Sequence, residues 1–93
     1  MDKYETVFLM KDDITEEQRN EVINEVQKYL NKNAEIIQGE DLGKRKLAYE
    51  IRKYQYANSY LIQFIGKADI IYELKRKYRL NENILKFIII KNN

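Results

Sequence analysis

The chain has 93 residues, 44% of them hydrophobic and 34% charged, with 17 bases and 15 acids and a formal charge of +2. This length and composition predict one soluble globular domain over residues 1–93. Because the chain contains no Cys and no His, disulfides, thiolate chemistry, hydrolase triads and the commonest metal ligand are excluded.

A strand and then a helix are the first predicted elements. Residues 4–10 are rich in β-branched and aromatic types, and both faces become apolar at mid-strand, which predicts a central strand. Thr15 and Gln18 match a helix capping box. Asn33 is placed to end that helix in a left-handed conformation. The apolar stripe between these ends, at helical spacing, consists of Val22, Ile23, Val26, Tyr29 and Leu30.

The middle of the chain predicts either one long bent strand or two short strands. Residues 34–38 and 46–52 are typical of strands. Gly39 and Gly43, which lie between them, indicate a bulge or a bend. The apolar residues of the second segment alternate and are expected to face the core; they are Leu47, Tyr49 and Ile51.

The last third of the chain repeats the pattern of strand, helix and strand. Residues 54–58 are expected to form a turn into a strand over residues 59–65. Asp69 opens a second helix, and residues 84–91 form a final strand after a turn at residues 81–83. The order β-α-β-β-α-β predicts an α+β fold with a four-stranded antiparallel sheet and two helices on one face. The apolar stripe of the second helix contains Ile70, Ile71, Leu74 and Tyr78.

Two helices on one face leave the other face of the sheet open. The side chains expected to face the helices are Thr6, Phe8, Ile62, Phe64, Phe87 and Ile89. The side chains expected to face outward are Val7, Leu9, Leu61, Ile65, Ile88 and Ile90. Because these aliphatic residues recur on several strands, they predict a partner-binding surface. The alternative is scattered apolar residues of the kind common on protein surfaces.

Acids and bases are divided unevenly along the chain. Residues 1–41 hold 11 acids and 5 bases, or −6, whereas residues 42–93 hold 4 acids and 12 bases, or +8. Such an asymmetry in charge indicates a nucleic-acid partner. Contacts to phosphates need Lys or Arg side chains on a rigid element. A merely solvated charged surface is the alternative, and the basic run of the second helix is equally favoured by the helix dipole. The expected RNA contacts are Lys3, Lys44, Arg45, Lys46, Lys53 and Lys86.

Aromatic residues fall mostly on the predicted core stripes. Tyr54 and Tyr56 lie among basic residues instead, so they are candidates for stacking on RNA or packing against a partner. An RNA-recognition motif is not expected, because its open sheet face carries aromatic residues and the predicted face is aliphatic. The paired acids at residues 12–13, 16–17 and 40–41 lie in caps or turns, where no catalytic or metal role is expected.

Four segments of the chain match one known pattern in their order and spacing. They are Tyr4-Glu5, Leu42-Gly43-x-Arg45-x-Leu47-Ala48-Tyr49-x-Ile51-x-Lys53, Leu85-Lys86 and Ile90-Lys91. This pattern resembles the bacterial small-subunit ribosomal protein S six (S6) family over essentially the whole chain. In three places the sequence departs from it: Glu50 stands where the family usually has Pro, Asn33 where it has Gly, and Lys86 where it commonly has Arg. The first exchange predicts a strand that is straighter or more fully paired.

The resemblance implies a ferredoxin-like sandwich without enzymatic activity or cofactor. It implies a cytoplasmic, ribosome-associated component of the small ribosomal subunit. The implied partners are the central domain of 16S ribosomal RNA and ribosomal protein S eighteen (S18), the latter in a heterodimer. No membrane partner is expected, because the longest apolar run, residues 87–90, is too short to span a bilayer.

Two other functions are compatible with the same topology. A ferredoxin-like regulatory module would bind a small ligand or form a homodimer through its open sheet face, without RNA. A phosphatase of acylphosphates would need a phosphate-cradling loop after the first strand. Residues 11–13 at that place are Lys-Asp-Asp, whose net negative charge would repel such a substrate.

Overall fold

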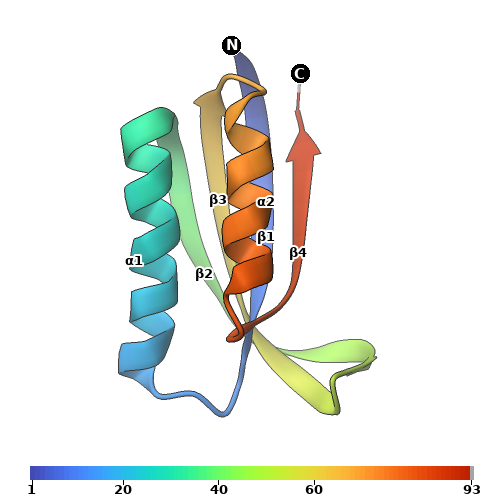
Figure 1. The fold of residues 1–93 in the computed structure, drawn as a ribbon. Helices are drawn as coiled ribbons and strands as arrows, with labels where there is room; N and C mark the ends of the chain where they lie inside the picture. Colours follow the sequence, from blue (N-terminus) through green and yellow to red (C-terminus); the bar gives the residue numbers. More distant parts are fainter. Residues whose placement is uncertain (93) are drawn as a thin grey trace.

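The computed structural model describes residues 1–92, which form one four-stranded antiparallel sheet and two helices. The strands lie in the order β2-β3-β1-β4, so β1 is central and β2 and β4 are the edges. Both helices cover the same face of the sheet (Figure 1). The predicted β-α-β-β-α-β sandwich is therefore confirmed. The elements are β1 (Asp2–Lys11), α1 (Glu16–Asn33), β2 (Glu35–Ile51), β3 (Tyr54–Gly66), α2 (Ile70–Leu80) and β4 (Ile84–Lys91).

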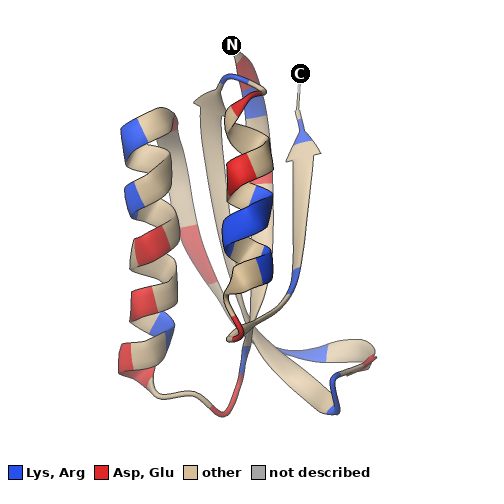
Figure 2. Cartoon of the chain, in the orientation of Figure 1, with Lys and Arg blue, Asp and Glu red and all other residues tan. Residues whose placement is uncertain are grey.

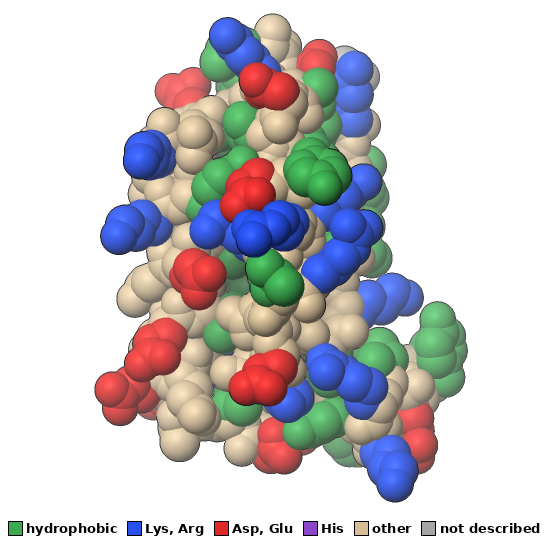
Figure 3. All heavy atoms as spheres, viewed as in Figure 1, with side chains coloured by type: hydrophobic (Ala, Val, Ile, Leu, Met, Phe, Trp, Pro, Cys, Tyr) green, Lys and Arg blue, Asp and Glu red, His purple; other side chains and the backbone are tan. Residues whose placement is uncertain are grey.

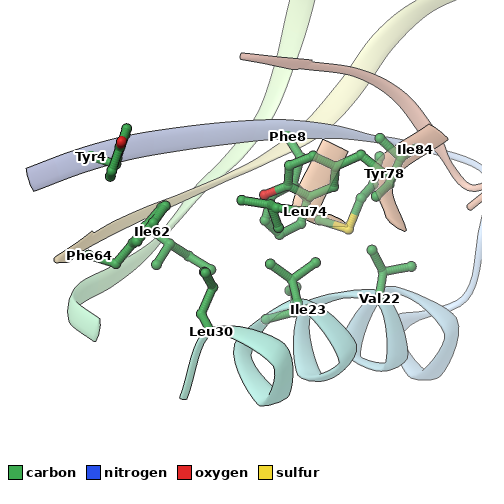
Figure 4. Close-up of a cluster of buried hydrophobic side chains, with 12 residues drawn as sticks. Tyr4, Phe8, Val22, Ile23, Leu30, Ile62, Phe64, Leu74, Tyr78 and Ile84 are labelled. Atoms are coloured by element: carbon green, nitrogen blue, oxygen red, sulfur yellow. The ribbon is translucent and has the colours of Figure 1, made fainter. Parts of the chain in front are cut away.

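The core lies between the helices and the inward face of the sheet (Figure 4). Phe8, Ile62 and Phe64 are fully buried there, and they pack against the apolar stripes of α1 and α2. Phe87 and Ile89 on the edge strand are half-buried and pack against the same cluster. The predicted inward row is thus confirmed, because the strict alternation of strand side chains sends every second residue to the helices.

One polar group, the hydroxyl of Thr6, is buried in this core. Its Oγ1 donates to the carbonyl oxygen of Ile88 at 3.0 Å and lies 2.9 Å from Tyr78 Oη. Because the carbonyl can only accept, the Thr6 proton points toward it and Tyr78 donates to Thr6. The pair satisfies two hydroxyls that would otherwise be costly to bury.

Tyr78 makes the stability of the fold sensitive to alkaline pH. Burial raises the pKa of Tyr78 above its ordinary value of about 10. The unfolded chain ionises this group near pH 10 while the folded chain does not, so stability is lost as the pH rises above about 10. Tyr78→Phe is expected to lower the free energy of unfolding by about 1 kcal/mol at neutral pH. It should also reduce the further loss between pH 8 and pH 11, as followed by urea denaturation. An alkaline loss in Tyr78→Phe equal to that of Tyr72→Phe, an exposed control, would contradict this.

Helix α1 begins as predicted and ends differently. Thr15 Oγ1 accepts from the backbone N–H of Gln18 at 3.1 Å, and Gln18 Oε1 accepts from that of Thr15 at 2.9 Å. The left-handed conformation predicted for Asn33 is wrong: Asn33 is the last helical residue, and Ala34 leaves the helix in an extended conformation. Asn33 Nδ2 donates to the carbonyl oxygen of Tyr29 at 2.9 Å. The side chain thereby satisfies a carbonyl that the helix end leaves open.

Strand β2 is one long strand with bulges, which confirms the first of the two alternatives. Its register against β3 shifts three times, after Ile36, Asp41 and Lys46. At the second shift, Gly43 has a φ of 79°, and its N–H donates to Asp41 Oδ1 at 2.8 Å. A Cβ at Gly43 would meet no atom within 4 Å. Glycine is therefore required there for its backbone conformation and not for space.

The third register shift overturns two predictions for the end of this hairpin. Four residues of β2, residues 47–50, lie opposite the single residue Gln55 of β3, so the strand at Glu50 is not more fully paired. The turn is not formed by residues 54–58, which belong to β3. The chain reverses instead at Arg52 and Lys53, whose φ values are 47° and 69°. Two consecutive positive φ values match the tight hairpin turn that usually contains Asn or Gly, so the sequence carries no turn signal there.

Candidate nucleic-acid interface and partner face

The outer part of the β2–β3 hairpin, residues 44–56 and here called the hairpin tip, bends away beneath the start of β4 (Figure 1). Bulges increase the local twist of a strand, and two of them lie at the base and in the middle of this bend. Arg52 holds the tip in place, because its Nη2 donates to the carbonyl oxygen of Ile84 at 2.8 Å and lies 3.5 Å from that of Glu82. Arg52 thus fixes the tip against β4.

The acidic connection after β1 holds the other side of the hairpin tip. Lys44 Nζ lies 3.5 Å from Asp12 Oδ2, and Tyr54 Oη donates to the carboxylate of Asp13 at 2.9 Å. That hydrogen bond is the largest of the effects that raise the pKa of Tyr54 above its ordinary value. Tyr54 is therefore engaged within its own chain, and the charge of Lys44 is partly balanced.

Three of the predicted RNA contacts converge between the hairpin tip and the outer face of the sheet. Arg45, Lys46 and Lys86 line a hollow of about 240 Å³, here called the Tyr49 hollow. Lys86 Nζ lies 5.8 Å from the centroid of the Tyr49 ring. None of the ion pairs within residues 1–92 involves these three cations. They are therefore available to an anion from outside. The remaining lining comes from Leu9, Leu47, Ala48, Tyr49, Ile51 and Ser59.

The other predicted RNA contacts lie apart from this hollow. Lys53 is exposed in the turn of the hairpin tip, and Lys44 pairs with Asp12. Lys3 lies opposite Ile65 at the far end of β1. It is six residues from Leu9, or about 20 Å along the strand. The structure thus brings Arg45 and Lys46 together with Lys86 and leaves Lys3 separate.

Tyr49 is the aromatic residue whose position the sequence did not reveal. The prediction that it faces the core is wrong, because 68% of its surface is exposed. The same prediction is wrong for Leu47 and Ile51, which are half-buried but lie outside the core cluster and line the Tyr49 hollow. Arg45 pairs with Ala57, which has the same side-chain parity as Ser59 and Leu61 on the outer face, so the alternating residues that follow Arg45 point to that face and not to the core. Tyr56, predicted as a stacking candidate, is 40% exposed and has Lys44 Nζ 5.2 Å from its ring centroid.

The predicted aliphatic residues share the outer face of the sheet. Leu61, Val7 and Ile88 lie side by side across β3, β1 and β4. Ile88 is 47% exposed and Ile90 48%. The remaining members of the set are half-buried. The face also carries a polar row, in which Gln63 Nε2 donates to Glu5 Oε1 at 3.1 Å beside Ile90. We call these residues the outer face: Val7, Leu9, Leu61, Ile65, Ile88 and Ile90.

The charge asymmetry of the sequence is also an asymmetry in space. Acidic residues dominate the first turns of α1, whereas Lys and Arg mark α2 and the hairpin tip (Figure 2). Basic side chains cover α2 on the helix side of the molecule (Figure 3). They are engaged within the chain: Arg76 pairs with Glu73 at 3.2 Å, Lys77 lies over the Tyr29 ring and Arg79 over the Phe87 ring. These contacts favour a structural role for the basic run of α2.

Residues 1–92 contain neither a candidate metal cluster nor a candidate membrane-spanning helix. No group of three or more Cys, His, Asp or Glu side chains there is arranged to hold a metal ion. No helix in that part of the chain is both long and apolar enough to cross a membrane.

Comparisons of the sequence and of the structure with known proteins agree on one family. The family model for ribosomal protein S6 matches residues 3–91. Small ribosomal subunit protein bS6 of Nitratiruptor sp. is 40% identical over 94 residues, which cover 98% of this chain and 72% of the relative. The bS6 protein of Helicobacter acinonychis is 38% identical over 92 residues, which cover 98% of this chain and 65% of the relative. The crystal structure of 30S ribosomal protein S6 from Thermotoga maritima has a TM-score of 0.93 at 27% identity and covers 98% of this chain and 87% of that one. The chain thus spans 65 to 72% of the length of the two curated relatives.

Proposed function

Because this chain belongs to the ribosomal protein S6 family, whose members are structural components of the small ribosomal subunit and not enzymes, we propose that it binds 16S ribosomal RNA. The binding site is the central domain of that RNA, and ribosomal protein S18 is the protein partner. Residues 1–93 act as a single RNA-binding domain of the cytoplasmic ribosome. The convergence of Arg45, Lys46 and Lys86, which form no ion pair within residues 1–92, is the observation that carries the proposal.

The hairpin tip supplies the RNA-binding charge. Residues 44–56 hold five bases and one acid. A rigid strand positions Lys and Arg side chains so that they bind phosphates without losing much conformational freedom. Arg45 offers a planar fork to a phosphate, whereas Lys46 and Lys86 act as point charges. Lys44 and Lys53 flank this group, and Lys3 offers a separate contact at the far end of β1.

The outer face supplies the surface for S18. Leu61, Val7 and Ile88 form an aliphatic row across three strands, and Ile88 and Ile90 are the most exposed members. Burial of such side chains against a partner stabilises a complex by about 25 cal/mol per Å² of apolar surface. The row ends beside the hollow that contains Lys86, since Leu9 and Lys86 are paired residues. RNA and S18 would therefore lie next to each other, so we expect them to bind cooperatively.

The salt dependence of RNA binding tests the role of the hairpin tip. Each phosphate neutralised adds about −0.7 to −0.9 to the slope of log K against log salt concentration. The double variant Arg45→Ala/Lys46→Ala is expected to reduce the magnitude of this slope by about 1.4 to 1.8. The measurement is a filter-binding titration of a central-domain 16S transcript with S18 present, at several salt concentrations.

The matched control is Lys75→Ala/Arg76→Ala, which removes two bases from α2 and is expected to leave the slope unchanged. An unchanged slope in the hairpin variant would assign the phosphate contacts elsewhere. A protein that forms a stable homodimer and ignores the transcript would support the regulatory module instead.

A further inference from the structure

Tyr49 combines the features of an aromatic platform for a planar ligand. Its side chain is 68% exposed on a part of the chain that is otherwise tied down, since Arg52 fixes the hairpin turn to Ile84 and Tyr54 is bound to Asp13. Lys86 Nζ lies 5.8 Å from the centroid of the ring. An exposed aromatic residue held by rigid neighbours can stack on a planar group at little cost in conformational entropy.

The hollow beside Tyr49 limits the size of that group. Its volume is about 240 Å³, which is smaller than the roughly 300 to 1,000 Å³ of pockets for drug-sized ligands. A single planar ring fits such a space. Leu9 and Leu47 give the hollow apolar lining, which favours a mostly uncharged group.

The cations around the hollow favour a ligand whose planar ring is joined to a negatively charged group. Arg45, Lys46 and Lys86 line it and have no ion pair within residues 1–92. Glu50, the single acid of the hairpin tip, accepts a hydrogen bond from Gln55 Nε2 at 3.3 Å. A flat ring joined to a negatively charged group is the chemistry of a nucleotide, in which a base stacks on an aromatic residue and a phosphate binds the cations.

We infer that the Tyr49 hollow is a binding site for one unpaired RNA nucleotide, with its base against Tyr49 and its phosphate on Lys86, Lys46 and Arg45. This inference rests on the proposed function and extends it. Phosphate contacts alone would fit a paired helix as well as a single strand, whereas a base can reach the hollow only when it is unpaired. The site therefore places a bulge, loop or junction nucleotide of the RNA at the hairpin tip.

A single tryptophan reports directly on this site. The chain contains no Trp, so Tyr49→Trp introduces one indole whose fluorescence a stacked base would quench. Quenching is expected with a hexamer of adenylate and with the central-domain transcript, and not with a duplex RNA of equal length. Tyr72→Trp is the matched control, because Tyr72 is 77% exposed on α2 and far from the tip in the chain.

Affinity for the transcript gives the second readout. Tyr49→Ala is expected to weaken binding about 5- to 150-fold without changing the salt dependence, since base stacking on an aromatic residue accounts for that range. Tyr49→Phe keeps the ring and should bind like the original chain. Tyr72→Ala is the control for loss of an exposed tyrosine, and neither alanine variant is expected to unfold the protein.

The outcomes separate the inference from the proposed function. If Arg45→Ala/Lys46→Ala weakens binding and Tyr49→Ala does not, the protein binds RNA by its phosphates and the nucleotide site is refuted. If the transcript does not bind the original chain at all, the proposed function is refuted, and the nucleotide site that rests on it is refuted too. A change in Tyr49→Trp fluorescence on adding S18 alone would assign the hollow to a protein side chain and overturn the inference.

Discussion

Ile88→Asp is expected to weaken association with S18 by roughly 100-fold or more, because an isolated carboxylate buried in an apolar interface costs several kcal/mol. Ile88 lies beside Val7 in the aliphatic row of the outer face and is 47% exposed. Because nearly half of the Ile88 side chain is exposed to solvent in the free protein, Asp can be hydrated there. The substitution is therefore expected to weaken the complex more than it destabilises the fold. The measurement is calorimetric titration of S18 into each variant.

Tyr72→Asp is the control for this experiment. It adds the same charge to an exposed residue on α2, on the opposite side of the sheet. An acid in the first turn of a helix is also compatible with the helix dipole. If Ile88→Asp binds S18 as tightly as Tyr72→Asp does, the outer face is not the S18 surface.

Phe8→Ala is expected to lower the free energy of unfolding by about 3 to 5 kcal/mol, since it removes a large side chain from a closely packed core. Phe8 is fully buried at the centre of β1, and its ring centroid lies 5.8 Å from that of Tyr60 and 5.4 Å from that of Tyr78. Domains of this size are stabilised by only about 5 to 15 kcal/mol in total. The variant should therefore unfold at much lower urea concentration.

The same urea titration of Tyr72→Ala gives the baseline for an exposed tyrosine, where a change within about 0.5 kcal/mol is expected. A loss below about 1 kcal/mol for Phe8→Ala would mean that the cluster in Figure 4 collapses around the missing ring or is not the centre of stability.

The regular parts of the fold were predictable from local patterns. The apolar residues on both faces of β1 around Phe8 predicted a central strand, and the capping box at Thr15 predicted the residue at which α1 starts. These signals are local, because side-chain parity and capping depend on a few neighbouring residues. The same parity separated the outer face from the core.

The hairpin tip was not predictable in the same way. Its turn uses Arg52 and Lys53 at positive φ, where Asn or Gly would have given a signal. The turn is held by contacts distant in the chain, from Arg52 to Ile84 and from Tyr54 to Asp13. A pattern confined to neighbours cannot contain such contacts, so the exposure of Tyr49 appears only in three dimensions.

The basic residues show the same division. Lys44, Arg45 and Lys46 are adjacent in the sequence, so their clustering was visible at once. Lys86 joins them because the bent hairpin brings the tip beneath β4, whereas Lys3 stays at the far end of β1. The basic residues are visible in the sequence, but only the fold shows which of them lie close together.

Assembly into small ribosomal subunits is the most direct test of the account. Subunits are reconstituted from 16S ribosomal RNA and the other small-subunit proteins, and incorporation of this chain is read from the sedimenting fraction of a sucrose gradient. The original chain is expected to sediment with the subunits, and the triple variant Arg45→Ala/Lys46→Ala/Lys86→Ala is expected to remain at the top of the gradient at physiological salt. Equal incorporation of both would contradict RNA binding through the hairpin tip.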